Sequence, residues 1–230
     1  MKRRREYDWP EEAEKIKEQE RERIIHQIDP HFVFNTLGAI RIATKTNTDL
    51  AYDMIYDFSK YLRAVLHALT HRENIFFKDE EAHVITYLNL EKMRFGDNIA
   101  FRKDIQTEDF MLPPLSLVPL VDNAVRHGLQ RGKRKGVVTL RTYQTAAEYI
   151  VQVEDDGVGF ETAKYKALPA DDNAQAGGLQ RVRYLVENMV DGSMEIKSFM
   201  GIGTIITLYI PKDKQSGKVV CHEDKSYSGR

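Results

Sequence analysis

The stretch QIDPHFVFN, residues 27–35, decides the architecture of the first part of the chain. It places His31 at the edge of a helical pattern that runs from about Glu11 to Ala43. Pro30 removes a backbone hydrogen bond from this helix, which predicts a kink beside the histidine. At about 100° per residue, one face of the helix carries the following residues: Ile24, Ile28, Phe32, Asn35, Ala39 and Ile42.

A second helix is predicted from about Asp49 to Thr70, after a short polar loop at Thr44–Thr48. Its apolar residues are spaced by three and four: Ile55, Phe58, Leu62, Val65 and Leu69. Two helices joined by a short loop form an antiparallel hairpin. Since a unit of about 60 residues buries too little apolar surface to be stable alone, we expect a second copy to cover the remaining stripe. The expected product is a dimeric four-helix bundle.

Beyond His71 the pattern alternates between helices and strands. Helices are predicted at about 79–95, 115–128 and 178–190, the first ending at Gly96. Strands rich in β-branched and aromatic residues are predicted at 99–105, 137–142, 149–153, 194–198 and 204–210. These elements predict a mixed sheet with helices on one face, a two-layer α/β sandwich within an α+β chain.

Three short motifs lie in this second part. Asn123 falls on a predicted helix with Arg126 and His127 one turn later on the same face. An amide oxygen suits Mg²⁺, and the basic residues would lie near phosphate oxygens. Without further context, such a group on a helix is also typical of a solvent-facing surface.

The other two motifs are rich in glycine, and the second of them has two parts, Gly177–Leu179 and Gly201–Thr204. Asp155-Asp156-Gly157-Val158-Gly159 follows a predicted strand and on its own is compatible with an ordinary turn. Gly177-Gly178-Leu179 opens a helix, whose free N–H groups favour phosphate. Gly201-Ile202-Gly203-Thr204 precedes the last strand, where a hairpin turn is the plain explanation.

In this order, the motifs and the segments between them resemble a sensor histidine kinase of the LytS-like subfamily, from about Glu20 to Pro211. The resemblance implies a histidine phosphotransfer hairpin followed by an ATP-binding domain of the GHKL (Bergerat) type. His31 would be the phosphoacceptor, because a neutral imidazole can attack phosphorus without a strong base. Asp29 or Asn35 would orient the ring, although Asp29 is equally compatible with a merely exposed position.

The resemblance also implies a nucleotide site that takes ATP and Mg²⁺. Asn123 would hold the metal, with Arg126 and His127 near the phosphates. Asp155 would receive the adenine amino group, and glycines would let the backbone approach the base. The remaining cofactor-binding residues implied are Gly157, Gly159, Gly177, Gly178, Leu179, Gly203 and Thr204.

The sequence departs from the family pattern at three positions. Asp29 stands where asparagine is more frequent, and Asp122 replaces a glutamate. Ala176 occupies the first position of a Gly-x-Gly-Leu pattern, which puts the hinge of the expected lid, 161–176, in doubt. The basic run 131–136 is expected to be a solvated loop rather than a phosphate contact.

Composition sets the remaining expectations. A net charge of −1 argues against direct nucleic-acid binding. The single cysteine, Cys221, indicates a reducing, cytoplasmic setting. The longest apolar stretch, 110–121, is broken by prolines and is too short for a membrane helix. The basic start, Met1–Arg5, fits either a solvated helix start or the cytoplasmic flank of an upstream membrane sensor segment.

The resulting prediction is a histidine kinase core with four parts: a signalling or linker helix (1–19), a dimerisation and phosphotransfer hairpin (20–72), a catalytic ATP-binding domain (73–212) and a disordered tail (213–230). The expected partners are a second copy and a response-regulator receiver domain of the LytTR or AraC-like type. The alternative is a nucleotide-binding pseudokinase scaffold, to which Ala176 points. An ATP-driven clamp of the gyrase and chaperone type leaves His31 without a purpose.

Overall fold

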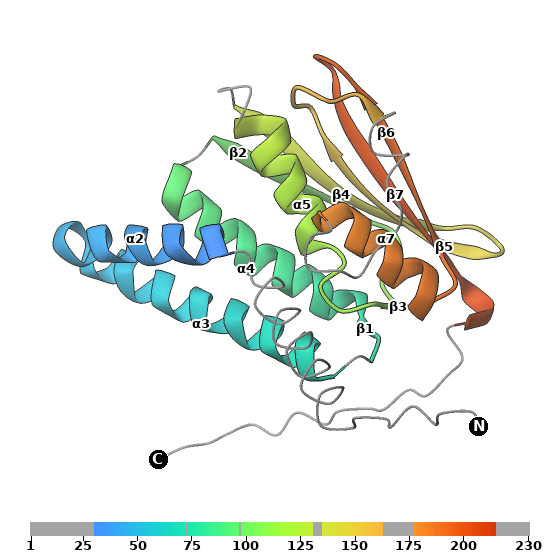
Figure 1. Ribbon diagram of the computed structural model, residues 1–230, viewed down its shortest axis with the longest axis horizontal. Helices are drawn as coiled ribbons and strands as arrows, with labels where there is room; N and C mark the ends of the chain where they lie inside the picture. The colour runs from blue at the N-terminus through green and yellow to red at the C-terminus, as the bar shows by residue number, and fades with distance from the viewer. Residues whose placement is uncertain (1–29, 72, 97, 131–134, 163–176, 215–230) are drawn as a thin grey trace, which may run out of the picture.

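The computed structural model describes residues 30–71, 73–96, 98–130, 135–162 and 177–214. A helical hairpin comes first, formed by α2 (Pro30–Thr46) and α3 (Thr48–Thr70). The third helix, α4 (Phe77–Phe95), packs along α3 and beside α2, and the sandwich lies on its other side (Figure 1). Because α2 begins at the first described residue, the predicted kink at Pro30 lies outside the described part of the chain.

The connection between α2 and α3 is much shorter than the predicted loop at Thr44–Thr48. Thr44 and Thr46 belong to α2, where their hydroxyls donate to the carbonyls of Arg41 and Ile42. Only Asn47 separates the helices. Its backbone is extended, and its side-chain oxygen Oδ1 caps α3 by accepting from the N–H of Leu50. An asparagine cap therefore replaces the expected polar loop.

The hairpin buries part of the predicted stripe, including Phe32, Phe58 and Val65. In α2 the buried side chains are Phe32, Thr36, Ile40 and Ala43, whereas the predicted Ile42 is 62% exposed. In α3 the buried side chains are Ala51, Met54, Phe58, Tyr61 and Val65, whereas the predicted Ile55 is 50% exposed. These buried stripes face each other and α4, so part of the expected apolar face is exposed on the surface of the hairpin.

A five-stranded mixed sheet forms the second layer, in the order β2-β4-β5-β7-β6. Its strands are β2 (Ile99–Ile105), β4 (Gly136–Gln144), β5 (Glu148–Asp155), β6 (Ser193–Phe199) and β7 (Gly203–Pro211). β2 and β4 run parallel, and the other neighbours are antiparallel. Alternating burial along β4 puts Val138 and Leu140 into the core under the helices. The two-layer α/β sandwich and the α+β class are confirmed.

The helices over the sheet are α5 (Val118–Asn123), which continues as the π-helix η1 (Ala124–Gln130), and α7 (Gly178–Met189) (Figure 1). The predicted helix at 115–128 thus begins three residues late. Leu115 has a left-handed backbone (φ 58°), and the buried carboxylate of Glu80 accepts the N–H groups of Leu115 and Leu117 at 2.6 and 2.8 Å. A small sheet of β1 (Ile75–Phe76) and β3 (Met111–Leu112) was not predicted.

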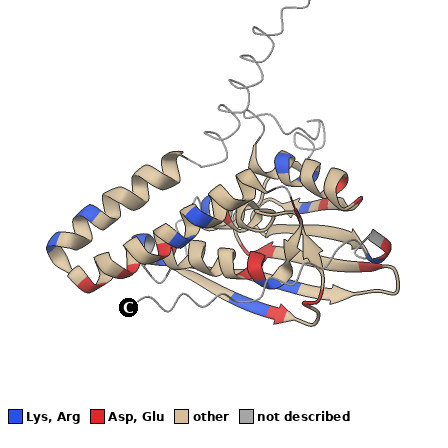
Figure 2. Ribbon diagram, turned by 90° about the horizontal axis from the view of Figure 1, so that it is seen from below, with Lys and Arg blue, Asp and Glu red and all other residues tan. Residues whose placement is uncertain are grey.

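No helix within these described ranges has both the length and the apolar character to cross a membrane. Lys, Arg, Asp and Glu residues occur along both the hairpin and the sandwich (Figure 2). The short 3-10 turn η2 (Lys212–Lys214) follows β7, and the tail expected to be disordered lies almost wholly outside the described residues.

Candidate functional site

His31 lies on the first turn of α2 and is exposed, next to an anchored residue. The following side chain, Phe32, is 1% exposed and packs against Tyr61 and Tyr87, with ring centroids 4.8 and 5.3 Å apart. The Arg94 guanidinium carbon lies 5.8 Å from the centroid of the Phe32 ring. Because Phe32 is held on three sides, the backbone beside His31 is fixed and its imidazole points outward from α2.

The imidazole faces the helix that carries the predicted metal and phosphate residues. Nδ1 of His31 lies 2.8 Å from the Nη2 donor of Arg126, although the two residues are 95 positions apart in sequence. The side-chain amide nitrogen of Asn35, one turn along α2, lies 2.9 Å from Nε2 and 3.0 Å from Nδ1. The fold therefore brings the predicted phosphoacceptor, one predicted orienting residue and one predicted phosphate ligand together.

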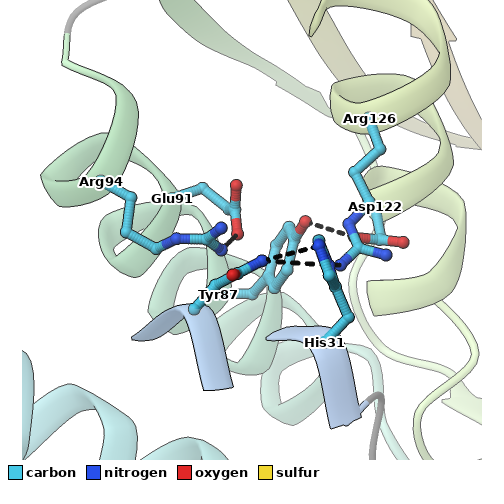
Figure 3. Close-up of polar contacts among 7 residues, drawn as sticks. His31, Tyr87, Glu91, Arg94, Asp122 and Arg126 are labelled. Carbon is cyan, nitrogen blue, oxygen red and sulfur yellow. Dashed lines mark hydrogen bonds and ion pairs between the residues drawn. The ribbon is translucent and has the colours of Figure 1, made fainter. Parts of the chain in front are cut away.

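Arg126 is itself held by two residues behind it. Its Nε donates to Oδ1 of Asp122 at 3.1 Å, and the hydroxyl of Tyr87 donates to the same oxygen at 2.6 Å (Figure 3). Tyr87 is 2% exposed, and burial together with the nearby Asp122 carboxylate raises its pKa well above the ordinary value. Tyr87 therefore remains a neutral donor. We call His31, Asn35, Tyr87, Asp122 and Arg126 the histidine cluster.

A cavity of about 470 Å³ opens beside this cluster. Phe34, Gly38 and Ile42 line it from α2, while Glu91 and Arg94 line it from α4. Glu91 and Arg94 form an ion pair whose side chains are almost completely buried. The cavity volume lies in the range of small-molecule sites, so there is room next to His31 for a phosphorylated group.

A second cluster is built around Asp155, the last residue of β5. Asp155 is 5% exposed, and its carboxylate accepts from the N–H of Gly157 at 2.9 Å and from the hydroxyl of Thr204. Burial raises the pKa of Asp155 to about 6, while those two donors act in the opposite direction. We call Asp155, Gly128, Gly157, Gly203 and Thr204 the aspartate cluster.

Two glycines of this cluster permit close backbone approach. A Cβ on Gly157 would lie 2.4 Å from the backbone of Gly128, and one on Gly203 would lie 2.0 Å from the carbonyl oxygen of Asp155. Gly203 also has φ 139°, which side-chain-bearing residues rarely adopt. The glycines therefore allow β5, β7 and η1 to meet around one buried carboxylate.

The π-helix η1 links the two clusters. It carries Arg126, which contacts His31, and Gly128, whose carbonyl accepts the N–H of Val158 at 3.1 Å. A π-helical turn is rare and is frequently found at functional sites. η1 therefore contacts both the histidine and the aspartate clusters.

The aspartate cluster suits an adenine nucleotide for a chemical reason. A carboxylate that is largely withdrawn from water gains from a further N–H donor, and the adenine amino group is such a donor. At the start of α7, Gly177 caps the helix without a side-chain hydrogen bond, and a Cβ on Gly178 would lie 3.4 Å from Pro119 of α5. This helix N-terminus therefore lies beside the helix that carries Asn123, an arrangement compatible with phosphate.

Some of the other predicted site residues have defined positions, and the rest lie outside the described residues. Asn123 is half-buried at the end of α5, and Leu179 is buried on α7. Gly159 has φ 63° and lies against the backbone of Phe199. Asp29, Ala176, the side chain of His127 and most of the expected lid lie outside the described residues.

Sequence reasoning missed the residues that support the site. Glu80 and Tyr87 on α4 fix the start of α5 and Asp122, and Ser198 donates to the carbonyl of Gly203 at 3.1 Å. Asp156, to which the sequence assigned no role, accepts from the N–H of Val137 at 2.9 Å. In the sequence, Glu80 and Tyr87 stand out only as residues with a polar group on an otherwise apolar helix face. Their hydrogen-bond partners lie 35 positions away, so the sequence does not indicate them.

Comparison with known families gives two matches. Residues 19–99 match the family described as histidine kinase, and residues 116–214 match the family described as histidine kinase-, DNA gyrase B-, and HSP90-like ATPase. The first match spans α2, α3 and α4, and the second spans α5 to the end of β7.

Individual proteins are similar over most of the chain. Sensor histidine kinase YpdA of Escherichia coli (strain K12) is 34% identical over 82% of this chain and 33% of its own length. YwpD of Bacillus subtilis (strain 168) is 31% identical over 83% of this chain and 69% of its own length. Sensor protein LytS of Streptococcus agalactiae serotype V is 29% identical over 84% of this chain and 32% of its own length. The chain thus spans about a third of the length of YpdA and LytS.

Proposed function

Because the chain belongs to the sensor histidine kinase family, with a LytS-like phosphoacceptor segment and a GHKL ATPase domain, we propose that it binds Mg·ATP and phosphorylates itself on His31. A nitrogen–phosphorus bond forms at the ring while the bond from the γ-phosphorus to the bridging oxygen breaks. ADP leaves with that electron pair, and the ring gives up its N–H proton. The protein contributes alignment and charge neutralisation to this step.

One observation carries this proposal above the others. The imidazole of His31 lies 2.8 Å from Arg126, which is three positions beyond the proposed metal ligand Asn123. A phosphoacceptor must approach the γ-phosphate to within a few ångström, and the position of His31 beside the helix proposed to hold that phosphate supports this role.

We assign the nucleotide as follows. The Asp155 carboxylate, with Thr204 beside it, accepts the adenine amino group, and Gly157, Gly159 and Gly203 let the backbone approach the base. Asn123 supplies an oxygen ligand to Mg²⁺. The phosphates are held by Arg126, His127, Leu179 and the helix start at Gly177 and Gly178. Mg²⁺, when bound, neutralises charge on the β- and γ-phosphates.

We propose a response-regulator receiver domain of the LytTR or AraC-like type as the partner. An aspartate oxygen of that domain attacks the phosphorus, and the nitrogen–phosphorus electron pair returns to the ring of His31. Asp29 or Asn35 orients the imidazole in both steps. DNA contact belongs to the regulator, and the setting is cytoplasmic, with an upstream membrane sensor as the proposed source of the stimulus.

We further propose a homodimer formed by the hairpin, with domain limits at 20–72 and 73–212 between a signalling helix (1–19) and a tail (213–230). The support is a set of large apolar side chains that the hairpin leaves exposed within the described residues: Phe34, Leu37, Ile42, Tyr52, Ile55, Tyr56 and Leu66. A second copy of the same surface would cover them. The predicted contributors Ile24 and Ile28 lie outside the described residues.

The experiment that tests the proposal is labelling with γ-labelled ATP, followed by acid and base treatment. We expect a label that survives base and is lost in acid, as for phosphohistidine. His31→Gln should abolish the label while ATP affinity stays within about twofold, since His31 is not assigned to nucleotide binding. A folded His31→Gln protein that retains the label would refute the assignment.

A further inference from the structure

The hydrogen bonds around His31 determine which ring nitrogen carries its proton. A guanidinium group can only donate, so Nδ1 of His31 is the acceptor of the 2.8 Å contact with Arg126. In a neutral imidazole the proton then resides on Nε2. The amide nitrogen of Asn35 lies 2.9 Å from Nε2 and 3.0 Å from Nδ1, and a half-turn of this amide puts its oxygen at that position, where it accepts from the Nε2–H.

This arrangement leaves neither ring nitrogen able to attack phosphorus. The lone pair of Nδ1 points at Arg126, and Nε2 has no lone pair in the ring plane because it bears the proton. Arg126 is also held in place, since Asp122 accepts from its Nε and Tyr87 fixes that carboxylate from the buried side. The contact therefore holds the histidine in a tautomer that does not react.

We propose that Arg126 restrains His31 as a reversible autoinhibitory contact, which is broken when the phosphates of a bound nucleotide draw the guanidinium away. Release rests on the proposed function, because it needs a nucleotide in the adjoining site; the restraint itself does not. The neutral Nδ1–H tautomer of the freed ring then offers the Nε2 lone pair to the phosphorus. Arg126 is thus a positioning residue that links nucleotide binding to nucleophile exposure.

Charge explains why a nucleotide wins this competition. A guanidinium binds phosphate oxygens through paired, charge-assisted hydrogen bonds, which are about twice as strong as bonds between neutral groups. The imidazole of His31, which accepts from Nη2 of Arg126, is neutral in the Nε2–H tautomer, whereas the Asp122 carboxylate binds Nε of Arg126. Asn123 and Gly128 flank Arg126 on the same α5–η1 segment, so phosphates bound there are within reach of its side chain.

The first test measures the tautomer directly. We would record ¹⁵N spectra of histidine-labelled, nucleotide-free protein at pH 8, where an ordinary imidazole is neutral, and assign His31 by comparison with His31→Gln. The wild type should show the Nε2–H form, and Arg126→Met should show a mixture of both tautomers. Arg41→Met is the matched control, because it removes an exposed arginine from the same helix as His31.

The second test measures reactivity without any nucleotide. Diethyl pyrocarbonate acylates an imidazole through its free lone pair, and peptide mass spectrometry separates His31 from the other six of the seven histidines. We expect His31 to react about tenfold faster in Arg126→Met than in the wild type, given the strength of one hydrogen bond to a charged donor. Arg41→Met should react at the wild-type rate, and circular dichroism would check that each variant is folded.

The last test adds Mg²⁺ with the non-hydrolysable analogue AMP-PNP to the wild type. The Nε2–H bias of His31 should then be lost, as in Arg126→Met. A nucleotide-free wild type in the Nδ1–H form, or equal reactivity in the wild type and Arg126→Met, would overturn the restraint. If the Nε2–H bias of His31 persisted at saturating AMP-PNP, release of His31 by nucleotide would be overturned. If AMP-PNP did not bind, both the proposed function and this release would be contradicted. The restraint by Arg126 would still be decided by the first two tests.

Discussion

The hairpin and the sandwich complete their cores in different ways. In the sandwich, the described strands bury Val138, Leu140, Val151 and Leu208 completely, and its most exposed large apolar residues gather at the β6–β7 turn. The hairpin exposes large apolar side chains along both of its helices, with Tyr52 at 71% and Ile42 at 62%. The sandwich is thus self-sufficient, whereas the hairpin buries one stripe against α4 and leaves another to be covered. Substitutions at two neighbouring positions, one on each stripe, can test which stripe is buried in a single chain.

Val65→Asp should give the largest effect. Val65 is 1% exposed within α3, so the substitution buries a carboxylate that has no assigned partner. We expect a loss of about 4 kcal/mol or more in the free energy of unfolding, measured by urea denaturation. Leu66→Asp is the matched control at protein concentrations where the chain is monomeric, since Leu66 is 51% exposed in a single chain and the loss there should stay below about 1 kcal/mol. Equal losses would contradict the assignment of a buried and an exposed stripe.

Ile55→Asp tests what covers the second stripe. Ile55 is 50% exposed on α3, so the isolated chain should tolerate the change, but a dimer seam would receive an uncompensated charge. We expect the dimer dissociation constant to rise about thirtyfold, equivalent to about 2 kcal/mol, by analytical ultracentrifugation. Ile85→Asp on α4, outside the hairpin, should leave dissociation unchanged. A dimer that resists Ile55→Asp would place the seam elsewhere.

The same contrast explains how far the sequence could predict the fold. The alternation of apolar and polar residues along strands, and glycines at the ends of elements, predicted the five strands, α4, α7 and the two-layer architecture. These signals could be read from the sequence because they are local. The sequence predicted an apolar face on the hairpin but not how it divides, because periodicity finds the face whereas α4, a tertiary partner, decides which of its residues are buried and which, such as Ile42 and Ile55, stay exposed in one chain. The loop at Thr44–Thr48 was wrong because one asparagine cap sufficed.

The site was predictable to a similar extent. The motifs named His31, Arg126, Asp155 and Thr204, and the structure brings them into two clusters joined by η1. Tyr87 was not predicted, because its role depends on a hydrogen bond to a residue 35 positions away. Local patterns thus identified the chemical groups, and only the tertiary packing revealed what holds them.

Gly157→Ala tests close packing on the sandwich side. The new Cβ would lie 2.4 Å from the backbone of Gly128, so η1 or the loop after β5 must shift. We expect a loss of about 1–3 kcal/mol in stability together with weaker ATP binding, measured by denaturation and calorimetry. Gly38→Ala on α2 is the control: a Cβ there would meet nothing within 4 Å, and helix propensity favours alanine. A stabilised Gly157→Ala protein would show that this contact is loose.

The smallest effect concerns pH and the buried carboxylate of the sandwich. Burial raises the pKa of Asp155 from 3.8 to about 6 in the folded chain. Between these values the native state binds the proton more tightly than the unfolded state, so the Asp155 contribution to stability increases as pH falls from about 6 to about 4 and is absent above the folded pKa. ATP affinity should move in the opposite direction, because a protonated carboxyl is a weaker acceptor for the adenine amine.

The two opposite signs make this prediction specific. If only the ionised form binds the amine, the contribution of Asp155 to ATP affinity falls about fourfold between pH 7.5 and pH 5.5 for a pKa of about 6. The ratio of wild-type to Asp155→Asn affinity is the quantity to measure by calorimetry, because the titration of the ATP phosphates cancels in it. Asp155→Asn should also lose the stability gain on acidification, in denaturation curves at pH 4 and pH 6. An affinity ratio that does not change with pH would show that the buried carboxylate does not bind the adenine amine. The same conclusion would follow if acidification lowered both stability and ATP affinity in the wild type but not in Asp155→Asn.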